Sequence, residues 1–123
     1  MNLSTARVFV RDITQAKQFY AQQLSLPLKA DGSEHGFCVF SAGSVELVVE
    51  AVADNSPHEE QVLVGRFTGL SFSVPDVHAK HLELSSSGVV FTGEPEKQSW
   101  GGILATFQDP AGNELQIVQH PPA

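Results

Sequence analysis

The sequence predicts an α+β protein made of two βαβββ modules that form a curved mixed sheet around a cavity, with helices on the outer face. Three observations predict this fold. The chain has short strands with alternating apolar residues, and two amphipathic helical segments that each follow an Asp. The same order of elements then occurs twice, with Asp12 and Asp76 in equivalent places. An internal repeat indicates a fold more strongly than any single element does.

Module one is expected over about residues 3–53. The run "ARVFV" predicts a strand, and Asp12 can cap a helix over about 13–24. The apolar residues of this helix recur at helical spacing: Ile13, Ala16, Phe19, Tyr20 and Leu24. The runs "GFCVFSA" and "SVELVVEAV" then predict two strands joined by a turn at Gly43 and Ser44, so that two or three strands follow the helix of module one.

A connector with weak periodicity is expected over about residues 54–66, with one short strand at 60–64. Module two is expected over about 67–120 and opens with a strand at 69–74. Asp76 then begins a helix that ends near Ser86, before Gly88. Three strand candidates follow, "VVFTG", "GILATFQ" and "ELQIVQ", and the turn "DPAGN" joins the last two.

Length and composition indicate one globular domain. The 123 residues are 41% hydrophobic, which allows one sizeable core. The formal net charge of −7 disfavours binding to nucleic acid and to anionic membranes. The sequence has neither an apolar run of membrane-spanning length nor a signal-like N-terminus, so a cytoplasmic location is expected. Cys38, the single cysteine, is predicted to be a small buried core residue.

Strand alternation predicts a polar sheet face opposite the helices, which is either a ligand-binding groove or a solvent-exposed face. Both readings remain open on alternation alone. The residues on this face include Thr5, Arg7, Phe9, Glu46, Val48, Glu50, Gly69, Ser71, Ser73, Glu114, Gln116 and Val118.

The duplicated plan resembles the vicinal oxygen chelate superfamily, which includes glyoxalase I, fosfomycin-resistance proteins, extradiol dioxygenases and bleomycin-resistance proteins. The resemblance rests on "VFVRDITQAKQFY" and on "WGGILATFQDPAGNELQIVQ", with its Trp-Gly and Asp-Pro-x-Gly-Asn landmarks. It covers essentially the whole chain. It implies a curved sheet of paired βαβββ modules and a homodimer.

The resemblance also implies where a divalent metal would be held. In the metal-using relatives, His and Glu ligands stand seven residues before each helix-opening Asp and seven after the Asp of Asp-Pro-x-Gly-Asn. In this chain those positions hold Thr5, Gly69 and Gln116, and the corresponding strand of module one offers Glu46. A hydroxyl, an amide and a glycine are poor ligands for such an ion. We therefore expect no metal cofactor at the usual family site.

Gln116 keeps the shape of a glutamate without its charge, and its amide can both donate and accept hydrogen bonds toward a ligand. Solvation or pairing with a neighbouring strand is the alternative for this side chain. Trp100, which precedes two glycines, can stack on a planar ligand or pack at a junction between modules or subunits. Arg7 can hold an anionic group, pair with a carboxylate, or be solvated.

The predicted function is metal-free binding of a small molecule in a groove that a second subunit completes. The predicted ligand-binding residues are Thr5, Arg7, Phe9, Glu46, Gly69, Ser71, Trp100 and Gln116. One alternative is a lyase, isomerase or dioxygenase of the glyoxalase type with Glu46 as the base. The other is an interaction module whose cavity is vestigial. The predicted partners are a small-molecule ligand and a second copy of the chain.

Overall fold

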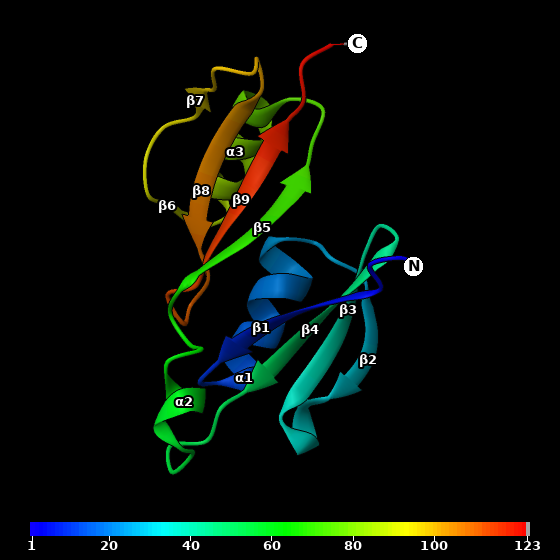
Figure 1. The fold of residues 1–123 in the computed structure, drawn as a ribbon, viewed down its shortest axis with the longest axis vertical. Helices are drawn as coiled ribbons and strands as arrows, with labels where there is room; N and C mark the ends of the chain where they lie inside the picture. Colours follow the sequence, from blue (N-terminus) through cyan, green and yellow to red (C-terminus); the bar gives the residue numbers. More distant parts are fainter. Residues whose placement is uncertain (123) are drawn as a thin grey trace. The chain divides into compact units, whose positions relative to one another are not determined.

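The computed structural model describes residues 1–122 and contains two compact units (Figure 1). Unit 1 comprises residues 1–66 together with 110–113, and unit 2 comprises residues 67–109 and those from 114 onward. Each unit has a sheet and a helix that covers one face of it. The predicted α+β class with two βαβββ modules is confirmed.

Unit 1 has a four-stranded sheet in the order β1-β4-β3-β2, in which β1 runs parallel to β4 and the other neighbours are antiparallel. Its elements are β1 (Thr5–Val10), α1 (Ile13–Gln18), the π-helical turn η1 (Phe19–Gln23), β2 (Leu28–Gly32), the 3₁₀ turn η2 (Ser33–His35), β3 (Phe37–Ala42), β4 (Val45–Ala51) and α2 (His58–Gln61).

Unit 2 has a sheet in the order β5-β9-β8-β6, and the short β7 also pairs with β8. Its elements are β5 (Phe67–Ser73), α3 (Val77–Ser86), β6 (Val90–Phe91), β7 (Glu96–Lys97), β8 (Ile103–Gln108) and β9 (Glu114–Gln119). Strand β5 is parallel to β9, and the turn at 109–113 connects β8 and β9 as an antiparallel hairpin.

The core of each unit lies between its helix and one sheet face. In unit 1, α1 and η1 bury apolar side chains against β3 and β4, and Cys38 is fully buried as predicted. In unit 2, α3 covers β8 and β9, as Figure 1 shows. The buried core side chains include Val8, Val10, Ala16, Phe19, Tyr20, Phe40, Leu47 and Val49 in unit 1, and Val77, Leu84, Phe107, Leu115 and Ile117 in unit 2. The strand alternation in the sequence identified this core face correctly.

The predicted strand at 60–64 is wrong, because residues 58–61 form the short helix α2. Pro57 stands just before this helix, and the Gln61 side chain closes the loop that leads into it. The Gln61 amide donates to the carbonyl oxygens of Ala53 (2.8 Å), Asp54 (3.1 Å) and Ser56 (3.1 Å). Within residues 60–64, only Val64 makes a strand-like bridge, to Phe9. These side chain–backbone bonds satisfy carbonyl groups that a strand ladder would otherwise satisfy.

The sequence did not locate two short strands: β2, which completes the expected βαβββ order of module one, and β7, which was not predicted. Strand β2 ("LKADG") lacks apolar alternation, since four of its five residues are exposed at the edge of the sheet. Strand β7 has only two residues. Neither strand has an alternation of apolar and polar residues from which it could be predicted.

Helices α1 and α3 begin directly after the predicted aspartates, Asp12 and Asp76. Asp12 Oδ1 accepts a hydrogen bond from the Gln15 amide at 3.1 Å, and Asp76 Oδ1 accepts one from the Ala79 amide at 3.1 Å. These side chains satisfy amides that have no partner inside the helix.

Asp76→Ala is expected to lower the free energy of unfolding by about 1 kcal/mol, because the first turn of α3 loses its cap. Urea denaturation measures this difference. Asp76→Asn keeps an acceptor oxygen and is expected to stay close to the parent. Equal losses in both variants would contradict a capping role.

Within residues 1–122, no helix combines the length and apolar character needed to cross a membrane.

Candidate functional site

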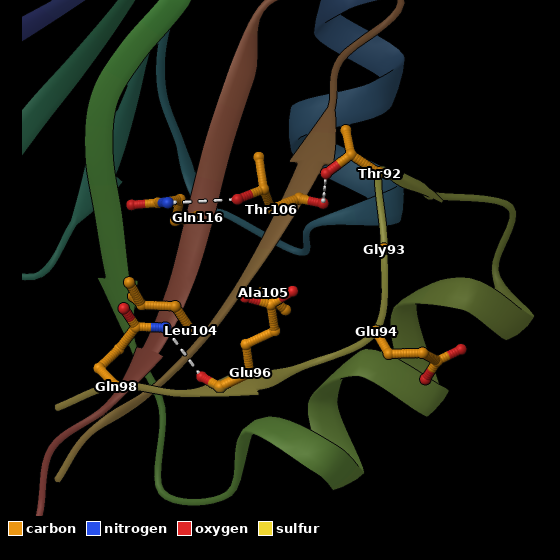
Figure 2. A pocket seen from close by; sticks show the side chains of 9 residues that line it. All are labelled: Thr92, Gly93, Glu94, Glu96, Gln98, Leu104, Ala105, Thr106 and Gln116. Carbon is orange, nitrogen blue, oxygen red and sulfur yellow. Dashed lines mark hydrogen bonds between the residues drawn. The ribbon is translucent and has the colours of Figure 1, made fainter.

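Gln116 lies in the middle of the unit 2 sheet, on the face opposite α3, and its side chain is partly buried (Figure 2). It stands beside Ser71 of β5 on one side and Thr106 of β8 on the other. The Ser71 hydroxyl donates to Gln116 Oε1 at 3.2 Å, and Gln116 Nε2 donates to Thr106 Oγ1 at 3.2 Å. Three neighbouring strands therefore position this amide.

Both hydrogen-bond neighbours of Gln116 are hydroxyl groups, which can each donate or accept. A primary amide has two N–H donors and two acceptor lone pairs, so the two observed bonds leave one donor and one lone pair of Gln116 for a further partner. The side chain is thus held in place while it keeps the capacity to bind a polar molecule.

A pocket of about 300 Å³ opens beside Gln116 in unit 2. Its floor is the open face of β8 and β9, and the segment 92–98 forms its wall (Figure 2). The lining residues are Thr92, Gly93, Glu94, Glu96, Gln98, Leu104, Ala105, Thr106 and Gln116. Thr92 Oγ1 donates to the Thr106 carbonyl at 3.3 Å, and this hydrogen bond connects the segment 92–98 to β8.

The pocket is mainly polar and carries negative charge. Its lining residues, all within the described part of the chain, include two carboxylates, two amides and two hydroxyls, and none is basic. In Figure 2 the side chain of Glu94 turns away from Gln116, whereas that of Glu96 extends toward Ala105. Such a lining suits a ligand with several hydrogen-bonding groups, and it favours neutral or cationic ligands over anionic ones.

Gly69, a predicted site residue, lies in an irregular part of β5. The register changes between Phe67, opposite Glu114, and Ser71, opposite Gln116. Thr68 occupies this bulge, because its hydroxyl donates to the Glu114 carbonyl at 2.8 Å and accepts from the Leu70 amide at 3.1 Å. Gly69 itself has φ of +75°, a backbone conformation that residues with a side chain rarely adopt.

The remaining strand positions belong to unit 1. Thr5 and Glu46 are register partners on β1 and β4. The Glu46 carboxylate forms an ion pair with Lys29 at 2.8 Å, and the Arg7 guanidinium forms one with Glu50 at 2.8 Å. Phe9 lies beside Glu50 in the register and is partly buried. The predicted residues thus form two groups, one in each unit.

Trp100 stands just before β8 and is half-exposed. Its ring covers Gly102, where an added Cβ would lie 2.0 Å from Trp100 Cζ3, and it lies 6.1 Å from the His120 ring. The residues that line the pocket beside Gln116 do not include it. A ligand-binding role for Trp100 therefore stays a prediction.

The donor groups at the four family positions do not fit a divalent metal. Gly69 has no side-chain donor, Thr5 and Gln116 offer neutral oxygens, and the Glu46 carboxylate already neutralises Lys29. Across residues 1–122, the structure has no group of three or more His, Cys, Asp or Glu side chains placed to hold a metal ion.

The profile of the Glyoxalase/Bleomycin resistance protein/Dioxygenase superfamily matches residues 2–117. The chain belongs to this superfamily. Uncharacterized protein YurT of Bacillus subtilis (strain 168), a sequence relative, is 30% identical over 128 residues, which cover 97% of this chain and 99% of YurT.

Solved structures of other proteins share the fold. The antibiotic binding protein TnmS3 from Streptomyces sp. CB03234 superposes with a TM-score of 0.77 and 27% identity, over 98% of this chain and 96% of TnmS3. Lactoylglutathione lyase from Agrobacterium tumefaciens has a TM-score of 0.76 and 18% identity, over 96% of this chain and 92% of that protein. The likeness to the lyase shows a shared fold alone.

Thr106 and the wall segment 92–98 were not predicted as part of the site in this glyoxalase-superfamily chain. Thr106 could have been found, because the hairpin around "DPAGN" places it opposite Gln116. The wall carries no comparable signal, since it has only the two residues of β7 in regular structure and little apolar periodicity.

Proposed function

We propose that this chain binds a small polar organic molecule in the unit 2 pocket, with Gln116 as the central hydrogen-bonding group. The observation that carries the proposal is the position of the Gln116 amide. Ser71 and Thr106 hold it at the floor of a pocket of about 300 Å³, with hydrogen-bonding capacity to spare. The similarity to TnmS3, an antibiotic binding protein, supports small-molecule binding as the class of activity.

The proposal has three further parts. Binding needs no metal ion, because the donor groups at the family positions are unsuited to one. The protein acts as a homodimer in the cytoplasm, and the second subunit completes the ligand groove. Thr5, Arg7, Phe9, Glu46, Gly69, Ser71 and Trp100 are proposed as further ligand contacts in that assembly. The ion pair of Glu46 with Lys29 favours this binding role over that of a general base.

Gln116→Leu is expected to weaken binding of a pocket ligand about 10-fold or more, because the apolar side chain leaves polar ligand groups without a partner. A thermal-shift screen of hydroxyl- and amine-bearing compounds identifies the ligand, and calorimetry gives its Kd. The exposed Gln22 provides a matched control, and Gln22→Leu is expected to bind as the parent does. Equal affinities in the parent and Gln116→Leu would refute the assignment of Gln116.

Measurements of metal binding and of molecular mass test two other parts of the proposal, the absence of a metal ion and the dimer. Protein purified without a tag and titrated with Zn²⁺, Ni²⁺, Mn²⁺ and Fe²⁺ is expected to bind none of them tightly at one equivalent. Light scattering after gel filtration is expected to give the mass of a dimer. One tightly bound equivalent of metal would overturn the metal-free mechanism, and a monomer at all concentrations would overturn the shared groove.

A further inference from the structure

The wall of the unit 2 pocket places one carboxylate over the sheet. Glu96 of β7 is the register partner of Leu104 on β8, and side chains directly opposite each other in an antiparallel pair lie on the same face. Leu104 and Thr106 are two residues apart and therefore share the open face of β8. In agreement with this register, Figure 2 shows the Glu96 side chain extending over β8 toward Ala105. A molecule on the pocket floor would therefore meet this carboxylate.

Glu96 has no basic neighbour in the pocket. The lining includes no Lys, Arg or His, and the ion pairs found within residues 1–122 all involve other carboxylates. Lys97, which follows Glu96 in the chain, pairs with Ile103 and so lies on the opposite face of the sheet. The exposed Glu94 adds a second negative charge to the same wall. A cationic group of a ligand can supply the counter-charge that this wall lacks.

An apolar stretch of floor separates Glu96 from the Gln116 amide. Gln116 pairs with Thr106, two residues along β8 from Leu104, which pairs with Glu96. The two backbone positions are thus about 7 Å apart along the strands and about 10 Å apart across them. The Leu104 side chain lines the pocket between them. A ligand that reaches both ends needs a hydrogen-bonding group, an apolar centre and a cationic group, in that order.

We propose that the unit 2 pocket selects organic amines and that Glu96 determines this selectivity. The inference rests on the function proposed for the pocket and adds the charge of the ligand. The protonated amine donates to the Glu96 carboxylate, an amide or hydroxyl of the same molecule bonds to Gln116, and the body of the molecule covers Leu104. A hydrogen bond between an ammonium and a carboxylate is stronger than one between neutral groups, so it discriminates against ligands of the same shape without the charge.

Three benzamides test the proposal on the full chain: p-(aminomethyl)benzamide, which is cationic, p-toluamide, which is neutral, and p-carbamoylbenzoate, which is anionic. They share the ring and the amide and differ in the charge of the para group. Calorimetry is expected to show the cation binding about 5-fold tighter than the neutral probe, and the anion binding most weakly. Amide NMR signals of residues 92–98 and 104–106 are expected to shift on adding the cation. Equal affinities for the cation and the neutral probe, no binding of any probe, or shifts confined to other residues would overturn the inference.

Glu96→Gln removes the charge and keeps nearly the same shape. It is expected to weaken binding of the cation about 5-fold and to leave binding of p-toluamide unchanged. The matched control is Glu59→Gln, which removes one charge from α2 of unit 1, outside the pocket lining. This control measures the general attraction of cations to a chain with a formal net charge of −7, and it is expected to bind all three probes as the parent does. Equal weakening of the cation in both variants would refute the role of Glu96.

Gln116→Leu distinguishes failure of this inference from failure of the function proposed for the pocket. It is expected to weaken binding of all three probes, because they share the amide. If Gln116→Leu weakens all three while Glu96→Gln weakens none, the pocket binds through Gln116 without selecting charge, and only the amine selectivity is refuted. If Glu96→Gln weakens the cation alone while Gln116→Leu weakens no probe, the assignment of Gln116 is refuted and the amine selectivity stands.

Discussion

Asn113→Ala is expected to lower the free energy of unfolding by about 3 kcal/mol, because it removes three hydrogen bonds made by a fully buried side chain. Asn113 is fully buried. Its Nδ2 donates to the Phe9 carbonyl at 2.7 Å, and its Oδ1 accepts from the amides of Gly65 at 2.8 Å and Arg66 at 3.3 Å. One side chain thus connects the end of β1 with the segment that follows α2. Urea denaturation of parent and variant measures the loss.

Two variants control this prediction. Asn55 is exposed, and Asn55→Ala is expected to change stability by less than about 0.5 kcal/mol. Asn113→Asp keeps an acceptor for Gly65 and Arg66, but it removes the donor to Phe9 and places a carboxylate beside that carbonyl. It is therefore also expected to be strongly destabilising. A loss below about 1 kcal/mol in Asn113→Ala would show that water replaces the side chain at little cost.

The position of Asn113 explains part of the turn "DPAGN". Residues 110–113 belong to unit 1, although the strands on both sides belong to unit 2. Gly112, with φ of +85°, supplies a backbone conformation that few other residues adopt, and Asn113 then enters the core of unit 1. The motif that most strongly indicated the family therefore has a structural role.

The sequence predicted the elements whose physical signals are local. Asp12 and Asp76 cap α1 and α3 as expected, and Gly88 follows the end of α3 with φ of +94°. Alternation also placed Val8 and Ile117 on the buried face. These predictions succeeded because capping and alternation depend on residues close in sequence.

The sequence failed where the structure depends on contacts that are distant or irregular. The predicted strand at 60–64 depended on apolar content alone, whereas the bonds of Gln61 to the preceding loop stabilise a helix there. The alternation of side chains along β5 was predicted for a regular strand. Thr68 instead lies in a bulge, which places Gly69 outside the regular pairing of β5 with β9. A bulge of this kind has no distinctive sequence pattern.

The candidate site was also only partly predictable. Alternation placed Gln116 on the face opposite α3, and the hairpin register could have added Thr106. The wall at 92–98 depends on bonds such as that from Thr92 to the Thr106 carbonyl, which no spacing in the sequence indicates. The Lys29 partner of Glu46 lies on β2, a strand without alternation, so this ion pair was also missed.

Phe107→Ala is expected to lower the free energy of unfolding by about 3–5 kcal/mol, the largest effect among the substitutions considered. Phe107 is fully buried at the centre of unit 2. Its ring centroid lies 5.7 Å from that of Phe91 and 6.4 Å from that of Phe72, and Phe91 in turn lies 4.3 Å from His81 of α3. Truncation removes apolar contacts and leaves a cavity among three strands and the helix. Thermal and urea unfolding measure the loss.

The conservative variant Phe107→Leu tests whether the buried face and the pocket face of β8 act independently. It keeps an apolar side chain, and we expect it to lower the free energy of unfolding about half as much as Phe107→Ala does, since much of the buried volume remains filled.

Thr106, the next residue, points to the opposite face and lines the pocket beside Gln116. Phe107→Leu is therefore expected to bind a pocket ligand as the parent does, while Thr106→Val is expected to weaken binding with little loss of stability. If Phe107→Leu instead abolished binding in a folded protein, the core and the pocket would be coupled through β8, and the pocket could not be treated as a rigid site on an independent core.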